Sequence, residues 1–354
     1  MIIVLEPVCS SWIHEDANAG FLQLVRKNCK DRVVFIAEKE HIYCVRKICH
    51  IDDVEFVRIG STVPKKDADD FKHLLYYFRL LMLVICKYRP KKLFVLCAYR
   101  PCLLAAEMCA LFNHNVEVNI VIHSMIEKYK GNQDAYRCIF CLSQFFNKLR
   151  FITYSPYCTG NYWRIDEKKF IFMDLNYVDA EKKKVKKKGE EKIVIGIIGA
   201  CANEKAKKII LFINRHQLTK PYEFWVISNN GKMFRYIDNV KVLDLNFDRK
   251  RKQVLLQQLN YILLPYDQEE YALSASGVLW DAILHKIPCF MLGSDYLKYY
   301  MKYNIGYQAD NIKNLCKIII DKIQNIEDES QMFFVGLDQM MQKRDETMKF
   351  LLRE

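Results

Sequence analysis

A cluster of small residues, 274–277, stands where a strand, a loop and a helix are predicted to follow one another. The apolar run 261–264 predicts a buried strand, and apolar residues recur at helical spacing over 278–285. A loop of small residues before a helix leaves backbone N–H groups free at the positive end of the helix dipole, and Gly277 lets the backbone approach an oxyanion closely. The cluster is therefore a candidate phosphate site, although Ser276 is also a good cap for the helix.

Two histidines and an asparagine are further candidates for contact with a substrate. His14 and Asn18 lie four positions apart at the start of a predicted helix, so they share one helical face. His123 follows the apolar run 116–122, which predicts a buried strand with this histidine at its carboxyl end. A histidine at such a place either exchanges hydrogen bonds with a substrate near neutral pH or is a hydrogen-bonded structural residue.

The elements that would position these residues alternate between strand and helix. In the first half, we predict strands at 1–5, 33–37, 54–59, 93–97, 116–122 and 151–154, and helices starting near residue 16 and spanning 69–88, 101–112 and 136–149. In the second half, we predict strands at 193–198, 223–227, 240–243, 261–264, 287–292 and 305–307, and helices at 204–216, 249–259, 278–285, 312–323 and 329–352. This alternation predicts an α/β protein with two Rossmann-like, doubly wound domains that face each other across a ligand cleft.

A lysine-rich segment separates the two halves. Residues 181–192 read EKKKVKKKGEEK, with six lysines in the seven positions 182–188. Such a run does not pack into a core, so it predicts an exposed linker. It would also attract an anionic membrane surface, by about 1 kcal/mol per lysine. We therefore expect a first domain, a linker, a second domain and a terminal helix that packs back on the first domain, at 1–178, 179–192, 193–328 and 329–354.

The composition is typical of a globular protein with anionic ligands. The chain has 354 residues, 51% of them hydrophobic, and a net charge of +12, although a solvated basic surface accounts for much of this charge. Its 14 cysteines are scattered through apolar segments. Cys138 and Cys141 form a CxxC without a second pair, so we expect reduced thiols in the cytosol rather than disulfides or a zinc site. The most apolar segment, 74–86, contains Arg79 and is too short to span a bilayer.

Common cofactor motifs are absent from the sequence. Gly196 and Gly199 lack the spacing of the dinucleotide fingerprint, and no P-loop sequence occurs. Asp67 and Asp69 look like a metal-binding DxD, but they precede an apolar helix and fit its capped, acidic first turn better. We therefore expect neither a metal ion nor a cofactor.

A resemblance to a known family is carried by residues 264–288, which read LPYDQEEYALSASGVLWDAILHKIP. The segment resembles the donor-binding segment of GT-B glycosyltransferases, in particular the retaining group-one (family 4) enzymes of bacterial surface-polysaccharide synthesis. Asp281 stands seven positions before Pro288, where the resemblance implies an acid, usually Glu, that binds the nucleotide ribose. The alternative for Asp281 is a solvent-facing position on the helix.

The same resemblance implies contacts with the donor phosphates. Ser276 and Gly277 would hold the diphosphate together with Lys205, which would neutralise it, and Gly199 would belong to the donor-binding residues. A cation at that place stabilises the charge that accumulates on the bridging oxygen as a nucleoside diphosphate departs. The alternative for Lys205 is an ordinary surface lysine.

One position departs from the family pattern. The pattern has a second Glu, eight positions before Asp281, that often contacts the donor sugar, and this chain has Leu273 there. Tyr271, Ser274 or Ser276 would have to replace that contact. The departure therefore bears on both the sugar transferred and the presence of activity.

On the acceptor side, the resemblance implies that the loop carrying His14 and Asn18 faces the acceptor and that His123 lines the reaction centre. We therefore expect a cytoplasmic, metal-independent, retaining glycosyltransferase, at most peripheral to the inner membrane face. It would move a sugar from a nucleotide sugar to a glycan or lipid-linked acceptor, with no nucleic-acid partner. Two alternatives stay open, namely a GT-B sugar-nucleotide epimerase and a catalytically silent GT-B module that binds a nucleotide sugar or a partner.

Overall fold

The chain forms two compact units. The structure is a computed structural model that describes residues 1–11, 13–60, 69–122, 133–175, 192–229, 231–243, 249–325 and 332–353. Unit 1 comprises Met1–Val178, Tyr271–Ala275 and Asp338–Glu354, and unit 2 comprises Asp179–Glu270 and Ser276–Leu337. The chain therefore contributes to unit 1 at both of its ends and once more, briefly, in the middle of unit 2.

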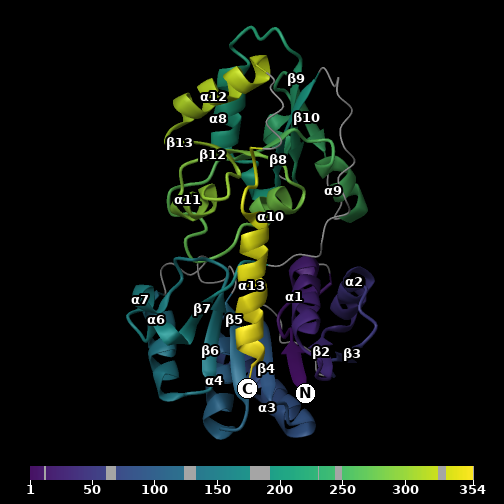
Figure 1. Cartoon of the computed structure of the whole chain (residues 1–354), viewed down its shortest axis with the longest axis vertical. Helices are drawn as coiled ribbons and strands as arrows, with labels where there is room; N and C mark the ends of the chain where they lie inside the picture. Colours follow the sequence, from purple (N-terminus) through teal and green to yellow (C-terminus); the bar gives the residue numbers. More distant parts are fainter. Residues whose placement is uncertain are drawn as a thin grey trace. The chain divides into compact units, whose positions relative to one another are not determined.

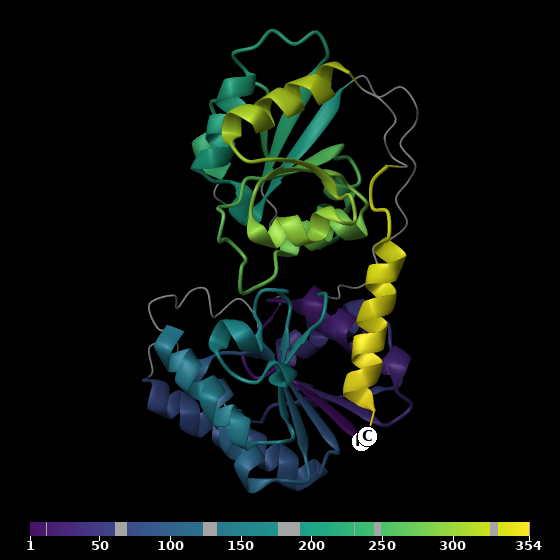
Figure 2. The same cartoon turned by 60° about the vertical axis from the view of Figure 1, so that its left-hand side comes forward.

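Unit 1 is built on a seven-stranded parallel sheet of order β3-β2-β1-β4-β5-β6-β7. In this sheet Ile3 of β1 is in register with Val34 of β2 and with Leu93 of β4. Helices α3, α4 and α6 line one face of the sheet, and α1, α2 and α13 line the other (Figure 1, Figure 2). The elements are β1 (Ile2–Leu5), α1 (Glu15–Asn28), β2 (Val33–Ala37), α2 (Lys39–Cys49), β3 (Val54–Arg58), α3 (Asp70–Tyr88), β4 (Lys92–Ala98), α4 (Arg100–Phe112), β5 (Glu117–Ile122), α6 (Gln133–Leu142), β6 (Leu149–Thr153), α7 (Gly160–Trp163), β7 (Phe170–Phe172) and α13 (Leu337–Leu352).

Unit 2 is built on a six-stranded parallel sheet of order β10-β9-β8-β11-β12-β13. Helix α8 packs against α12, where the Cys316 thiol donates a hydrogen bond to the Ile209 carbonyl. The elements are β8 (Ile193–Ile198), α8 (Glu204–Ile213), β9 (Tyr222–Ile227), β10 (Val240–Leu243), α9 (Arg249–Leu256), β11 (Tyr261–Leu264), α10 (Gly277–Leu284), β12 (Cys289–Leu292), α11 (Asp295–Met301), β13 (Gly306–Ala309) and α12 (Ile312–Gln324).

Continuous apolar runs explain why both sheets are parallel and covered on both faces. All six residues of β8, IVIGII, are buried, and so are all seven of β4, KLFVLCA. Strands buried on both faces are typical of sheets that helices cover on each side. The predicted α/β class, with two doubly wound parallel sheets, is therefore confirmed.

Several predicted helices have different bounds in the structure. Helix α8 ends at Ile213 rather than near residue 216, and α9 ends at Leu256 rather than near residue 259. The segment 136–149 gives most of α6, a short 3-10 turn at 143–145 and the start of β6, and the Ser143 hydroxyl donates to the Phe140 carbonyl. The last helix begins at Leu337 rather than near residue 329, because Phe334 and Gly336 have φ angles of 61° and 78°, which a right-handed helix does not admit. Within the described residues, no helix has both the length and the apolar character needed to cross a membrane.

Candidate functional site

The candidate site of unit 2 lies at the carboxyl ends of β8 and β11. The strand order of this sheet runs β8-β9-β10 in one direction and β11-β12-β13 in the other, so β8 and β11 flank the point where it reverses. Ligands of open α/β sheets bind in the crevice outside such a point. Two loops meet there, one from β8 to α8 at 199–203 and one from β11 to α10 at 265–276.

The loop after β8 presents Lys205 in the first turn of α8. Gly199 has a φ of 56°, which favours glycine, and its carbonyl accepts a 2.8 Å hydrogen bond from the Ser228 hydroxyl. Asn203 then caps α8, since its Oδ1 accepts from the backbone N–H groups of Lys205 and Ala206 at 3.0 and 3.1 Å. Gly196, three positions before Gly199, has a packing role, because a Cβ at this position would lie 2.4 Å from a methyl group of Leu259.

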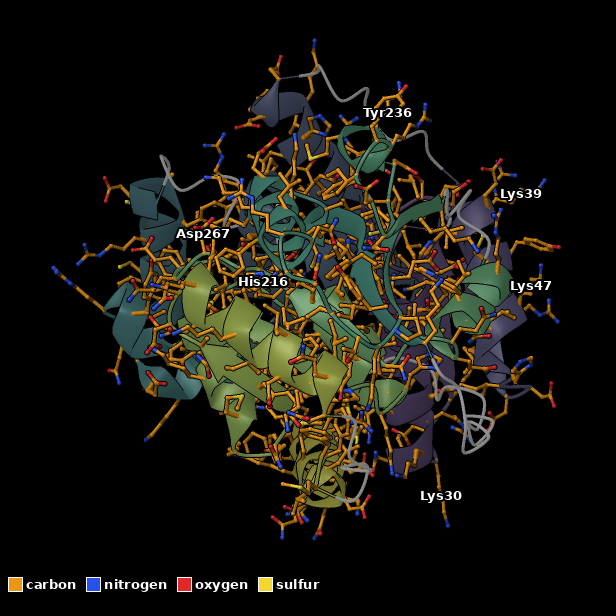
Figure 3. All side chains as sticks on the ribbon, turned by 90° about the horizontal axis from the view of Figure 1, so that it is seen from above. Lys30, Lys39, Lys47, His216, Tyr236 and Asp267 are labelled. Carbon is orange, nitrogen blue, oxygen red and sulfur yellow. The ribbon has the colours of Figure 1, made fainter. Side chains whose placement is uncertain are left out.

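The Lys205 ammonium reaches across to the second loop. It forms an ion pair with the Asp267 carboxylate and lies 3.4 Å from the Tyr266 carbonyl oxygen. The side chain of Asp267, which Figure 3 labels, is 75% exposed, whereas that of Lys205 is 32% exposed. The cation is therefore held at a solvent-accessible edge of the site by a partner that is itself mostly in water.

Ser276 caps α10 from a buried position. Its Oγ accepts from the Leu279 backbone N–H at 3.1 Å and shares a short hydrogen bond with the Tyr266 hydroxyl, while its own N–H donates to the Tyr296 hydroxyl at 3.2 Å. The Ser276 side chain is fully buried, so this serine caps α10 from the interior of the protein. The half-buried Gly277 is the first residue of the helix. Tyr266 thus connects the two loops, through its carbonyl to Lys205 and through its hydroxyl to Ser276.

Asp281 lies one turn further along α10 and is ion-paired. Its two carboxylate oxygens lie 2.8 and 2.7 Å from the Lys252 ammonium of α9. The Asp281 side chain is only 10% exposed, which differs from the alternative of a solvent-facing residue. An isolated carboxylate at this depth would be costly, and Lys252 supplies the compensating charge.

Two other predicted site residues of this segment belong to unit 1, together with the departure from the family pattern at Leu273. Tyr271, Leu273 and Ser274 lie in Tyr271–Ala275, which clusters with unit 1. Leu273 is 3% exposed and packs in the main apolar cluster of unit 1, and the Ser155 hydroxyl donates to the neighbouring Ala272 carbonyl at 2.5 Å. Unit 2 by itself therefore brings Gly199, Lys205, Ser276, Gly277 and Asp281 together, without Tyr271 and Ser274.

The acceptor-side residues His14 and Asn18 have distinct environments in unit 1. His14 is the half-buried N-cap of α1, with a φ of 57° and no side-chain capping bond. Asn18 is buried, and its Nδ2 lies 2.9 Å from both the Glu6 Oε2 and the His41 Nε2. His123 lies outside the described residues, as do the lysines 182–188.

Sequence reasoning did not find several residues that shape the site. Tyr266 and Asp267 follow Pro265 directly in the sequence, and this polar pair after a strand was the available signal. Lys252 belongs to a run of four basic residues, RKRK, at the start of α9. Basic residues are unfavourable at a helix start, and this unusual placement was the available signal for Lys252.

Comparisons with known proteins place the fold. No family model matches the chain, and no curated protein matches it in sequence. Solved structures do match. They include Anabaena HepE in complex with UDP and glucose, with 12% identity, a TM-score of 0.62, and coverage of 98% of this chain and 99% of that one. The sucrose-phosphate synthase of Thermosynechococcus elongatus has 12% identity and a TM-score of 0.62, and covers 99% of each chain.

An epimerase is similar to the same extent. The UDP-GlcNAc 2-epimerase of Neisseria meningitidis bound to UDP-GlcNAc has 12% identity and a TM-score of 0.60, with coverage of 99% of this chain and 100% of that one. Because these likenesses cover whole chains at low identity, they establish the GT-B fold of the protein and leave its activity to be argued from the site.

Proposed function

We propose that this protein transfers a sugar from a nucleotide-sugar donor to a glycan or lipid-linked acceptor. One observation carries the proposal. Lys205 and the N-terminus of α10 directly follow the two loops that flank the strand-order reversal of unit 2, and Tyr266 contacts both Lys205 and Ser276. A cation beside a helix start is suited to a diphosphate, which nucleotide sugars contain. The similar proteins solved with UDP and with UDP-GlcNAc support the same ligand class.

In this proposal Lys205 exchanges Asp267 for the donor diphosphate. An exposed ion pair contributes about 0–1 kcal/mol, so the exchange costs little. Gly199 and Gly277 let the backbone approach the phosphate oxygens. The ammonium then stabilises the charge that develops on the leaving diphosphate, and this step requires no metal ion on the phosphates.

Asp281 is proposed to accept hydrogen bonds from the nucleotide ribose, and Lys252 holds its carboxylate in place. Transfer would retain the anomeric configuration, with the donor phosphate assisting deprotonation of the acceptor. Unit 1 would receive the acceptor through the region of His14 and His123. A cytoplasmic role in bacterial polysaccharide synthesis, with peripheral contact of the lysine-rich segment at an anionic inner membrane face, completes the proposal.

Calorimetric titration with UDP-, GDP- and CMP-sugars tests this assignment. Lys205→Met is expected to lower the affinity for the preferred nucleotide about tenfold to a hundredfold, since hydrogen bonds to charged groups contribute about 1.5–3 kcal/mol. Lys208→Met, which removes an exposed lysine of the same helix, is the matched control and should bind normally. Equal affinity in the two variants would refute the role of Lys205, and an absence of nucleotide binding would refute the function.

Two alternatives have observations in their favour. Position 273 is a leucine that is buried in unit 1, so it offers no acid to a donor sugar, which favours a silent nucleotide-sugar-binding module. The similarity to UDP-GlcNAc 2-epimerase favours epimerisation. Incubation of the bound donor with and without an acceptor panel separates the three: a transferase releases nucleotide with acceptor, an epimerase converts the free donor, and a silent module does neither.

A further inference from the structure

A buried group of two thiols and a carboxylate has no part in the proposed binding of a nucleotide sugar. Glu6, Cys9 and Cys97 belong to unit 1, and their ligand atoms all lie within 4.8 Å of one another. Among the described residues, no other set of three or more His, Cys, Asp and Glu side chains could share an ion in this way. Glu6 is fully buried, and each cysteine is 6% exposed.

The group occupies the position in unit 1 where the strand order reverses. Strands β1 and β4 are neighbours in the sheet, and the order runs outward from them to β3 on one side and to β7 on the other. Glu6 and Cys9 follow the carboxyl end of β1, and Cys97 lies at the carboxyl end of β4. Such a point is where open α/β sheets bind ligands.

A hydrogen-bond network fixes the carboxylate. Oε1 of Glu6 accepts from the backbone N–H groups of Val8 and Cys9, and Oε2 accepts from Nδ2 of Asn18, each at 2.9 Å. Nδ2 of Asn18 also donates to Nε2 of His41, whose Nδ1 donates to a backbone carbonyl at 2.8 Å. A carboxylate has about four acceptor positions, and Glu6 also takes part in side-chain hydrogen bonds with Cys9 and Cys97, so both thiols lie against the carboxylate. Outer contacts of this kind orient the ligands of metal sites.

The backbone also turns Cys97 toward the group. The pairing of β4 with β5 shifts register between Val95 and Ala98, and Cys97 has a φ of 49°, in the left-handed region that favours glycine. A non-glycine residue in this region costs about 1–3 kcal/mol, and such strain occurs often at functional sites.

The pKa values of both thiols are raised by their surroundings. The hydrogen bond with Cys97 opposes the shift at Cys9, but burial and the charge of Glu6 raise the pKa of the Cys9 thiol above its ordinary value. The hydrogen bond with Cys9, together with burial, raises the pKa of Cys97 well above its ordinary value. A divalent cation reverses this balance, because a thiol that binds a metal is deprotonated.

We propose that Glu6, Cys9 and Cys97 form a binding site for a thiophilic divalent cation such as Zn²⁺. Two S–H bonds break, two metal–sulfur bonds form, and two protons leave to solvent for each ion bound. Three protein ligands leave one coordination position for water or a further ligand. Glu6 and Cys9 also line a pocket of about 460 Å³, whose wall includes Glu38 and Arg58.

Cobalt substitution tests the site in the full-length, reduced protein. Titration of the metal-free protein with Co²⁺ should give one bound ion per chain and a thiolate-to-cobalt charge-transfer band. Calorimetry with Zn²⁺ in buffers of different ionisation enthalpy should report two protons released. Cys9→Ser and Cys97→Ser should each remove the band and lower the Zn²⁺ affinity more than tenfold. Cys138→Ser, which disrupts the CxxC pair, is the matched control and should keep both.

Zinc-edge X-ray absorption of the wild type keeps the test decisive if a cysteine variant fails to fold. A ligand shell with two sulfurs and the remainder oxygen or nitrogen supports the site. No charge-transfer band, a shell of oxygen and nitrogen alone, or a band lost with Cys138→Ser but kept with Cys9→Ser would overturn it.

Discussion

At the residue scale, the pairing of Lys205 with Asp267 sets how readily an anion can reach the ammonium. The pair is exposed on the Asp267 side, so it holds the lysine in place with little free energy. A nucleoside diphosphate brings more negative charge than one carboxylate and also meets the helix start. Asp267 therefore competes weakly with the proposed donor.

We predict that Asp267→Asn raises nucleotide affinity by up to about fivefold, because it removes a competitor worth at most about 1 kcal/mol. The gain should shrink at high salt, since exposed charges are screened. Asp295→Asn, which breaks the exposed pair with Lys298 in the same unit, should leave the affinity unchanged. Calorimetric titration measures both variants. A clear loss of affinity in Asp267→Asn would mean that this carboxylate itself contacts the ligand.

A second residue-scale prediction concerns Glu107, on α4. It is 2% exposed, burial raises its pKa to about 9, and among the described residues neither carboxyl oxygen has a hydrogen-bond partner. Between pH 4.5 and 9 the folded protein therefore keeps a proton that the unfolded chain releases, so the free energy of unfolding falls as pH rises, by at most about 1.4 kcal/mol per unit.

Glu107→Gln cannot titrate, so we expect it to match the wild type near pH 5 and to be more stable at pH 8, by a few kcal/mol at most. Urea denaturation at the two pH values measures this. Glu346→Gln, at an exposed position on α13, should follow the wild type at both. A difference between Glu107→Gln and the wild type that does not change with pH would contradict the assignment.

How much of the candidate site could be predicted from sequence depended on whether a residue acts locally. Asp69 caps α3 and Ser276 caps α10, as their sequence neighbourhoods predicted, because a cap needs only the next three residues. The partners Lys252 and Tyr266 depend on how loops from different strands meet, and spacing along the chain does not encode that. The roles proposed for Lys205 and Asp281 stay predictions until a ligand is bound.

At the element scale, α10 depends on its N-cap residue, Ser276, more than on its length. It has eight residues, and Ser276 supplies both its cap and a link to Tyr266. Since isolated helices this short are marginal, tertiary contacts and the cap must hold it. Its N-terminus is also the element that the proposal places against the diphosphate.

We predict that Ser276→Ala destabilises unit 2 by about 1–3 kcal/mol, the loss of a cap and of one buried hydrogen bond, and also weakens nucleotide binding. Asn311→Ala is the matched control: it removes the side chain that caps α12 by accepting from the Asn314 N–H at 2.9 Å. It should cost about 1 kcal/mol of stability and no affinity. Thermal melts and titrations measure the two effects. If both variants lost affinity equally, the α10 terminus would have no special role.

At the scale of the whole molecule, alternation predicted the two parallel sheets, but not the path by which the chain completes unit 1. Buried runs such as β4 and β8 reveal strands through local apolar content. The inclusion of Tyr271–Ala275 in unit 1 involves five residues with no periodicity, and Leu273 joins that core through contacts with residues far away in sequence.

The C-terminal helix α13 belongs to unit 1, although most of unit 2 precedes it in the sequence. Its packing therefore bears on the stability of unit 1. Met348 and Leu351 are fully buried, and the Lys92 ammonium of β4 donates to the Arg353 carbonyl at 2.6 Å. Met348→Ala is therefore expected to cost about 2–5 kcal/mol. In hydrogen exchange, amides of β4 and β5 should lose protection while those of β8 and β11 keep it. Phe350→Ala, at a side chain that is 52% exposed, should change little. If Met348→Ala instead lowered protection in β8 and β11 as much as in β4, the two units would unfold as one, and the assignment of α13 to a separately stable unit 1 would fail.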